Sequence, residues 1–191
     1  MLFVSSCSIN LEAKKKEVVR IEVIGFGGSG HGSGFYISSD GLIATNYHVV
    51  KGGFIIQVVD YTGKRIPALV IKVDKVNDLA ILKINVKNHT FSSLDDSKVH
   101  LGEDVYVIGF PGRLEMVVNK GIISDTRANG FLTNDLLIHD GAVNPGASGS
   151  PLYNDKGNVI AINCGLYSKN GNFIGYSYAI PVKHLKNLMK K

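Results

Sequence analysis

The feature that most constrains this chain is a succession of short apolar runs from residue 18 onward, each ended by Gly, Asp, Asn or Lys. Runs of this kind, bounded by turn residues, are typical of β-strands. Six of them precede a less regular segment: Val18–Val23, Gly34–Ile37, Gly41–Thr45, Phe54–Val59, Ile66–Val73 and Leu79–Ile84. Six more follow it: Asp104–Gly109, Glu115–Ile123, Leu136–Ile138, Pro151–Tyr153, Val159–Asn163 and Gly175–Ile180. The spacing therefore predicts an all-β chain.

Six strands on either side of a linker over residues 85–101 suggest two six-stranded β-barrels in one compact unit. A length of 191 residues is compatible with one such domain. We expect a peptide tail over residues 1–17 and a folded domain over 18–191. Within that domain, the first barrel is expected over 18–90 and the second over 100–181.

A short helix is predicted at the C-terminal end, over residues 182–190. Pro181 suits the start of a helix, and Val182, Leu185 and Leu188 then recur at helical spacing. We expect this helix to pack as a cap on the barrels.

The net charge of +5 is concentrated at the two ends of the chain. Residues 1–20 hold four basic and two acidic side chains, and residues 183–191 hold four basic and none acidic, which leaves the body at −1. A nucleic-acid or membrane surface needs basic residues spread over one face. We therefore expect solvated basic ends and no nucleic-acid partner.

The two cysteines, Cys7 and Cys164, are too few for a disulfide framework and lack zinc-type spacing. No metal or cofactor is expected. The segment Met1–Cys7 resembles the last residues of a bacterial lipoprotein signal, which predicts a lipid anchor at Cys7 and a place in the cell envelope, either periplasmic or lipid-anchored. The alternative is an unstructured N-terminus with a chance cysteine, which leaves a cytoplasmic location open. The intact mass of the natively expressed protein distinguishes the two.

The stretch Gly25–Gly30 matches the GxGxxG pattern of a dinucleotide site. That pattern works only where a strand enters it and a helix leaves it. Here an alternating apolar stretch follows, so nucleotide binding is not expected. We interpret the stretch as a glycine-rich β-loop in which the backbone passes close to another segment or to a ligand.

The stretch Asn144–Pro151 places Ser148 among glycines in a tight loop. Such a loop can present a hydroxyl while neighbouring amides converge on one point, as a nucleophile with an oxyanion hole requires. The nucleophile elbow of α/β-hydrolases needs glycine two residues on either side of the serine, but position 150 is Ser. The elbow interpretation therefore fails.

A serine nucleophile needs a base, and two further residues occur in suitable contexts. His48 ends an apolar run, and Asp78 immediately precedes a Leu- and Ile-rich run. Either residue alone is ordinary, but the joint occurrence in the order His48, Asp78, Ser148 favours a triad. Asp74 and Asp140 are expected to be structural, as are the other histidines, which are His31, His89, His100, His139 and His184.

Four motifs together resemble the trypsin-like serine peptidases of the bacterial HtrA (Deg) type. They are Thr45-Asn-Tyr-His-Val-Val50, Asp78-Leu-Ala-Ile-Leu-Lys83, Asn144-Pro-Gly-Ala-Ser-Gly149 and Gly175-Tyr-Ser-Tyr-Ala-Ile-Pro181. The resemblance covers roughly residues 20–182. It implies a chymotrypsin-like double β-barrel with the active site in the cleft between the barrels, in agreement with the two sets of strands.

The resemblance also implies the role of each residue. Ser148 is the nucleophile, His48 the general base and Asp78 the group that orients the imidazole. The amides of Gly146 and Ser148 form the oxyanion hole. The substrate pairs as an extended strand with Asn163, Cys164, Gly165 and Leu166. Because Cys164 then lines the cleft, alkylation of its thiol is expected to slow catalysis.

Departures from the family pattern refine these expectations. Ala147 stands where digestive trypsins carry the aspartate that captures a new N-terminus, so activation by that route is not expected. Ala142 stands at the pocket position that is acidic in trypsin, which favours a small or medium apolar residue before the cleaved bond. Asn163 stands where glutamate-specific relatives carry a histidine, so a preference for glutamate is not expected. Family members commonly form trimers and normally continue into a PDZ domain, whereas the printed sequence contains the protease part only.

The sequence thus predicts a serine endopeptidase that cleaves extended or unfolded polypeptides through an acyl-enzyme. The alternative is a polypeptide-binding or chaperone-like module that keeps the fold and rarely cleaves. A complete triad in the sequence does not separate the two, because it does not establish that the oxyanion amides are preorganised.

Overall fold

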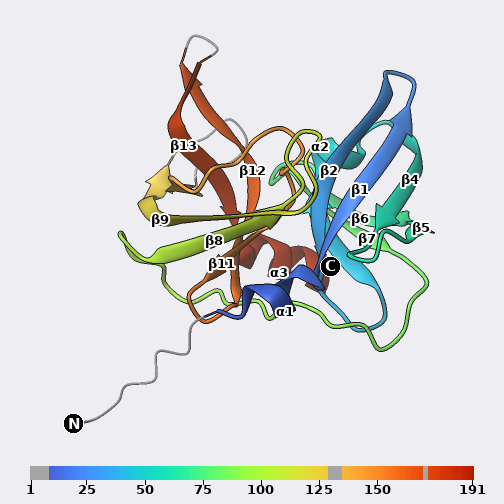
Figure 1. Ribbon diagram of the computed structural model, residues 1–191, viewed down its shortest axis with the longest axis horizontal. Helices are drawn as coiled ribbons and strands as arrows, with labels where there is room; N and C mark the ends of the chain where they lie inside the picture. Colours follow the sequence, from blue (N-terminus) through green and yellow to red (C-terminus); the bar gives the residue numbers. More distant parts are fainter. Residues whose placement is uncertain (1–8, 129–134, 170–171) are drawn as a thin grey trace.

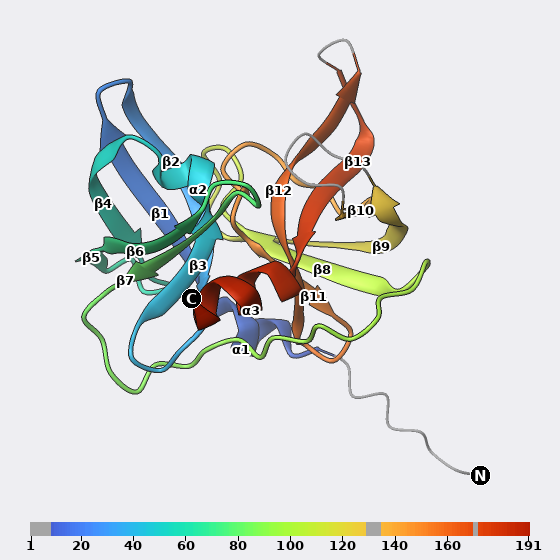
Figure 2. The same cartoon turned by 180° about the vertical axis from the view of Figure 1, so that it is seen from behind.

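Two β-units lie side by side in the computed structural model, which describes residues 9–128, 135–169 and 172–191 (Figures 1 and 2). The first unit contains α1 (Leu11–Lys15), β1 (Val18–Gly25), β2 (Gly28–Tyr36), β3 (Leu42–Asn46), α2 (Tyr47–Val50), β4 (Gly53–Val59), β5 (Arg65–Pro67), β6 (Leu69–Asp74) and β7 (Leu79–Lys83). The second contains β8 (Asp104–Gly109), β9 (Val117–Ala128), β10 (Leu136–His139), β11 (Pro151–Asn154), β12 (Val159–Lys169), β13 (Asn172–Pro181) and α3 (Val182–Lys190). The expected double-barrel fold is confirmed, with a difference in the first unit.

The first unit is a curled sheet of seven strands in the order β5-β4-β1-β2-β3-β7-β6. The single strand expected over Ile66–Val73 is divided in two, because the chain changes its pairing partner at Ala68. Up to that point it pairs with β4, and the last bond is from the Ala68 amide to the Ile56 carbonyl, at 2.9 Å. Beyond it the chain pairs with β7. The two edge strands are therefore consecutive in the chain, which curls the sheet back on itself.

The second unit is a closed barrel of six strands in the order β10-β13-β12-β11-β8-β9. Its strands β9, β12 and β13 are longer than the apolar runs that predict them. The difference arises because pairing between β12 and β13 continues through main-chain hydrogen bonds past the point where buried side chains stop. A strand can extend beyond its apolar core wherever a partner strand runs alongside.

The interface between the two units is apolar. One buried cluster combines Val18 and Phe35 from the first unit with Ile108 and Tyr153 from the second. The helix predicted over residues 182–190 is present as α3, and it adds the buried side chains Val182, Leu185 and Leu188 to the same cluster. Figures 1 and 2 show α1 and α3 at one end of the molecule, between the two units. None of the helices in the described parts is long and apolar enough to cross a bilayer.

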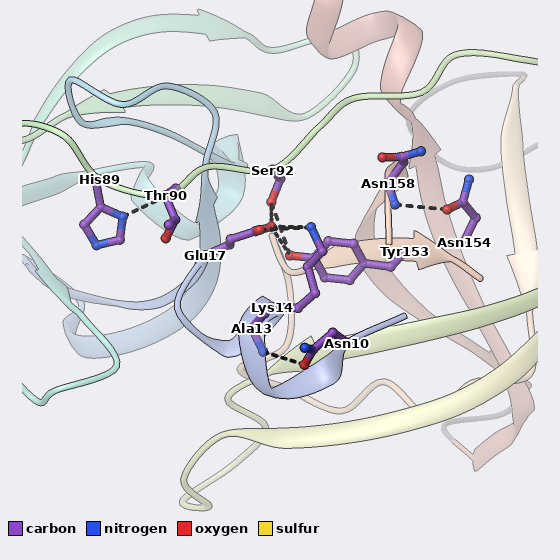
Figure 3. Close-up of polar contacts among 10 residues, drawn as sticks. All are labelled: Asn10, Ala13, Lys14, Glu17, His89, Thr90, Ser92, Tyr153, Asn154 and Asn158. Atoms are coloured by element: carbon purple, nitrogen blue, oxygen red, sulfur yellow. Dashed lines mark hydrogen bonds and ion pairs between the residues drawn. The ribbon is translucent and has the colours of Figure 1, made fainter. Parts of the chain in front are cut away.

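The segment expected as a solvated tail is folded from residue 9 onward. Asn10 caps α1 by accepting the Ala13 amide at 3.1 Å, and the chain then leads to Glu17, which is only 8% exposed. The Glu17 carboxylate accepts hydrogen bonds from Lys14 (2.9 Å), from the Ser92 hydroxyl (2.8 Å) and from the Tyr153 hydroxyl (3.3 Å) (Figure 3). These donors come from α1, the linker and β11, so one carboxylate joins three parts of the chain.

We predict that Glu17→Ala lowers the free energy of unfolding by about 2–4 kcal/mol, because the buried hydroxyls of Ser92 and Tyr153 lose their charged acceptor. Urea denaturation measures the change. The matched control is Glu12→Ala, whose carboxylate is 81% exposed and pairs only with Lys15 on the surface. We expect this control to shift stability by less than about 1 kcal/mol. Equal effects of the two substitutions would contradict a bridging role for Glu17.

Candidate active site

The turn between β6 and β7 presents the candidate acid. Asp74 builds this turn by accepting the amides of Val76 and Asn77 at 3.1 and 3.0 Å. The turn brings Asp78 to a positive φ of 51° with its side chain 4% exposed. Aspartate tolerates this backbone region better than most residues, and such conformations persist where the surroundings determine them. Asp78 is therefore held in one position.

His48 lies on the short helix α2 and is bound to Asp78 twice. The Asp78 carboxylate accepts the His48 amide at 2.8 Å and the His48 Nδ1–H at 2.6 Å. The Asp78 carbonyl also accepts the Tyr47 amide at 3.1 Å and the Asn46 side-chain amide at 3.0 Å. With Nδ1 engaged, a neutral imidazole presents its basic Nε2 outward. The His48 side chain is 46% exposed, so that nitrogen can meet a substrate or a nucleophile.

The loop that carries Ser148 is anchored through its carbonyl oxygens. Gly112 donates its amide to the Pro145 carbonyl at 2.6 Å, and Ser150 donates its amide to the Ala147 carbonyl at 3.0 Å. In a trans peptide the N–H points away from the C=O. The amides of Gly146 and Ser148 therefore point away from these anchors. Within the described residues neither amide has a hydrogen-bond acceptor.

Ser33 on β2 fixes the same loop from the other unit. Its hydroxyl donates to the Gly146 carbonyl at 2.8 Å and accepts the Phe110 amide at 3.0 Å. Its own amide donates to the Ser148 carbonyl at 2.8 Å. Ser33 is not among the residues predicted from the sequence. The signal that could have found it is its place between Gly32 and Gly34, because glycines within a strand mark a close approach of another segment to the backbone. A side chain at either glycine would meet neighbouring atoms at 2.8 Å or less.

Gly146 is required at its position for two reasons. Its φ is +98°, and a Cβ atom there would lie 2.5 Å from both the His31 ring nitrogen and the Phe110 carbonyl oxygen. His31 itself contacts that carbonyl at 3.1 Å. The backbone conformation that exposes the Gly146 amide is thus available only to glycine.

One cleft of about 580 Å³ contains the candidate base, the nucleophile and the oxyanion loop. Its walls include His48, Ser148, Pro145 and Gly146. Within the described residues no hydrogen bond joins the His48 ring to the Ser148 hydroxyl. Such bonds are often long in unliganded sites and shorten when substrate binds. The structure therefore brings together the predicted residues of the triad and the oxyanion hole.

Asn163 has a different role from the one expected of it. Its amide donates to the Ser150 carbonyl at 2.9 Å, and its carbonyl accepts the Gly149 amide at 2.8 Å, so its backbone groups are occupied. Its side-chain amide donates to Ser150, and its side-chain oxygen accepts from His139 at 2.8 Å. Burial lowers the pKa of the His139 imidazole to about 4. A neutral, buried histidine therefore supports the residue behind the Ser148 loop.

The edge of β12 that remains open begins after Asn163. Cys164, Gly165 and Leu166 face β13 on one side, and no described strand pairs with them on the other. Cys164 is partly buried, and its thiol donates to the Tyr178 carbonyl at 3.5 Å. Burial, helped by the negative charge of Asp78, raises the pKa of this thiol to about 12.

The remaining candidates have local roles. Asp140 accepts the Ile122 amide at 2.7 Å, His89 stacks on Tyr36 with ring centroids 3.8 Å apart, and His184 contacts Asp135. In the described ranges no group of His, Cys, Asp and Glu side chains could hold a metal ion. Cys7, the expected lipid-anchor residue, lies outside the described residues.

A model of the trypsin-like peptidase domain family matches residues 32–162. Among curated proteins, the chain is 41% identical over 169 residues to a probable periplasmic serine endoprotease, DegP-like, of Pseudomonas putida (strain GB-1), covering 84% of this chain and 35% of that protein. It is 38% identical over 159 residues to the magnetosome formation protease MamE of Paramagnetospirillum magneticum, covering 78% and 22%. The chain thus spans about a third or less of the length of these relatives.

Solved structures agree with the sequence matches. The HtrA-type protease AlgW with a tripeptide superimposes with a TM-score of 0.86 at 33% identity, covering 92% of this chain and 60% of that one. A serine endoprotease from Yersinia pestis gives 0.82 at 30% identity, covering 94% and 65%. The chain therefore belongs to the trypsin-like peptidase domains of the HtrA type.

We predict that Ser33→Ala slows the reaction of Ser148 with a fluorophosphonate by about 10-fold to 100-fold, because the Gly146 carbonyl and the Phe110 amide lose their shared partner. Adduct formation followed by intact mass measures the rate. Ser39→Ala is the matched control, since this exposed serine makes no side-chain hydrogen bond to a described residue. An unchanged rate in Ser33→Ala would show that the loop holds its shape without this hydroxyl.

We also predict slow alkylation of Cys164 in the folded protein. A pKa of about 12 in place of 9 leaves roughly a thousandfold less thiolate at pH 8. In a Cys7→Ser variant, iodoacetamide should therefore react far faster in urea than in buffer. Where an adduct does form on the folded chain, we expect catalysis to slow. Similar alkylation rates in urea and in buffer would mean that the thiol is accessible and ordinarily acidic.

Proposed function

We propose that the chain is a serine endopeptidase that hydrolyses peptide bonds in extended or unfolded polypeptides. One observation carries the proposal. His48, which is bound to Asp78, lines the same cleft as Ser148, and the amides of Gly146 and Ser148 have no acceptor among the described residues. A base, a nucleophile and oxyanion donors are the three elements that acyl transfer requires.

In the proposed mechanism, the Ser148 hydroxyl attacks the substrate carbonyl while His48 Nε2 takes its proton. The carbonyl oxygen becomes an oxyanion that accepts hydrogen bonds from the amides of Gly146 and Ser148. Asp78 holds the imidazole in the required tautomer and stabilises the imidazolium. Collapse of the tetrahedral intermediate breaks the C–N bond, and His48 gives its proton to the leaving amine. A water molecule, deprotonated by His48, then hydrolyses the acyl-enzyme.

The proposed substrate lies along the open edge of β12. Main-chain pairing with Cys164, Gly165 and Leu166 needs an extended chain and imposes little sequence preference. Ala142 offers no charge for a Lys or Arg side chain, so we propose a small or medium apolar residue before the cleaved bond. Ala147 packs in the core of the second unit, 2% exposed, which supports a loop that forms without zymogen cleavage.

The location is a further part of the proposal. The similar DegP-like proteins are named periplasmic. Together with the lipoprotein-like residues before Cys7, these names support a place in the cell envelope. Self-association as a trimer is proposed from the family resemblance alone.

The test is reaction of the purified protein with a fluorophosphonate, read by intact mass, together with digestion of casein. We expect one adduct on Ser148, absent in Ser148→Ala, and casein cleavage that depends on the same residue. Asp78→Asn should reduce the cleavage rate by about 10⁴-fold, because it removes the carboxylate that orients His48. Asp140→Asn is the matched control, since that carboxylate accepts the Ile122 amide and does not line the cleft.

Absence of both the adduct and cleavage would contradict the proposal. In that case equal binding of casein by the wild type and Ser148→Ala would support the polypeptide-binding module instead.

A further inference from the structure

The cleft that contains His48 and Ser148 extends toward the first unit. Its far wall is formed by the tip of the β1–β2 hairpin and by the turn that leads from α2 into β4, from Lys51 to Gly53. Among the described residues, none from β12 lines this cleft, so the expectation that Cys164 lines it is wrong. Figures 1 and 2 show this hairpin projecting at the end of the first unit that carries α2. The cleft therefore has a second arm, opposite the open strand edge.

Two aromatic side chains stand exposed at this second arm. Phe26, at the hairpin tip, is 100% exposed and lines the cleft, and Phe54, at the start of β4, is 59% exposed. Their ring centroids are 5.4 Å apart at an interplanar angle of 59°, a favourable aromatic geometry. On the same two strands, the register partners Ile24 and Ile55 are 45% and 46% exposed, and they line a neighbouring pocket and not this cleft. A contiguous exposed apolar patch beside a cleft is typical of an interaction site.

The glycines of the hairpin keep the floor of this arm free of side chains. A Cβ atom at Gly27 or at Gly30 would have no neighbour within 4 Å, and neither residue has a left-handed φ. Neither packing nor backbone conformation therefore requires glycine at these two positions. Space left open beside an aromatic pair is what a bound peptide needs.

The backbone that carries the aromatic pair is packed against the segment that follows the catalytic base. Gly25 and Gly53 are register partners, and a Cβ atom at Gly25 would lie 2.6 Å from the Gly52 carbonyl oxygen. The hairpin tip thus packs directly on the turn that follows α2, the helix that carries His48. The surface is presented by packed strands and is ready before a ligand arrives.

We propose that Phe26 and Phe54 bind an apolar side chain of the substrate, aromatic or branched aliphatic, within the first four residues after the cleaved bond. This inference rests on the proposed function. A substrate paired with β12 places its carbonyl at Ser148 and must leave the site on the other side. The second arm of the cleft lies on this side, where the substrate residues after the cleaved bond leave the site. The protein would then select unfolded segments by the apolar residues on the leaving side of the cleaved bond.

The substrate fits this surface better than a second copy of the chain does. Phe26 lines the same cleft as His48 and Ser148, so whatever sits on the pair also occupies the approach to the nucleophile. A contact between two copies outside the cleft would not explain why Gly27 and Gly30 leave space open within it.

The experiment compares cleavage sites in casein digested by the wild type and by Phe26→Ser/Phe54→Ser, identified by mass spectrometry. In the wild type we expect Phe, Tyr, Leu and Ile to be enriched in the four positions after the bond, and in the variant this enrichment should fall to the background composition. Residues before the bond should keep their distribution. Both side chains are largely exposed, so the variant should fold.

Two quenched peptides then measure the effect directly. Both contain the same casein residues before the bond, followed by Phe-Leu in one and Ser-Gly in the other. We expect the ratio of their kcat/KM values to fall by about tenfold in the double variant, as for loss of a binding anchor. Gly30→Val, which fills the floor, should lower the same ratio. Phe91→Ser is the matched control, because Phe91 is 49% exposed on the linker and does not line the cleft.

The fluorophosphonate reaction separates the outcomes. If Ser148 reacts in the wild type and in the variant, and the ratio does not change, the inference is overturned while the proposed function stands. An unchanged ratio with a smaller sedimentation coefficient for the variant would instead identify the patch as a contact between copies. A wild-type protein that neither reacts nor cleaves overturns the function and the inference together.

Discussion

The active-site loop depends on where its carbonyl oxygens are bound. The Pro145 carbonyl accepts the Gly112 amide, and the Ala147 carbonyl accepts the Ser150 amide. Ser33 donates to the remaining two carbonyls, those of Gly146 and Ser148. The geometry of the trans peptide then directs the amides of Gly146 and Ser148 away from these bonds. Donors fixed in this way cost little reorganisation when negative charge develops on a substrate oxygen. The proposed oxyanion hole is thus formed by the same hydrogen bonds that anchor the loop in the fold.

The same bonds join the two units. Ser33 belongs to β2 of the first unit, whereas Phe110, Gly146 and Ser148 belong to the second. At the opposite end, Glu17 connects α1 with the linker and with β11. The apolar cluster of Val18, Phe35 and Ile180 lies within the same interface. The interface that stabilises the protein therefore also aligns the residues of the site.

The sequence was sufficient for residues that stand in local motifs and insufficient for residues that act through distant partners. His48, Asp78 and Ser148 stand in short motifs that are recognisable when they occur together in this order, and the all-β fold follows from regular apolar runs. Ser33, His139 and Glu17 have partners 24 or more residues away, and a single polar residue leaves no periodic signal of such a contact. The family resemblance assigns Asn163 to substrate pairing with the rest of its strand, but the occupation of its backbone groups by Gly149 and Ser150 depends on tertiary pairing.

The division of the site between the units has a mechanical consequence. The His48–Asp78 pair lies wholly in the first unit, and the Ser148 loop lies wholly in the second. A rigid-body rotation of one unit against the other separates the base from the nucleophile while the imidazole–carboxylate pair stays intact. Under the proposed function, the rate of cleavage therefore depends on the angle between the two units.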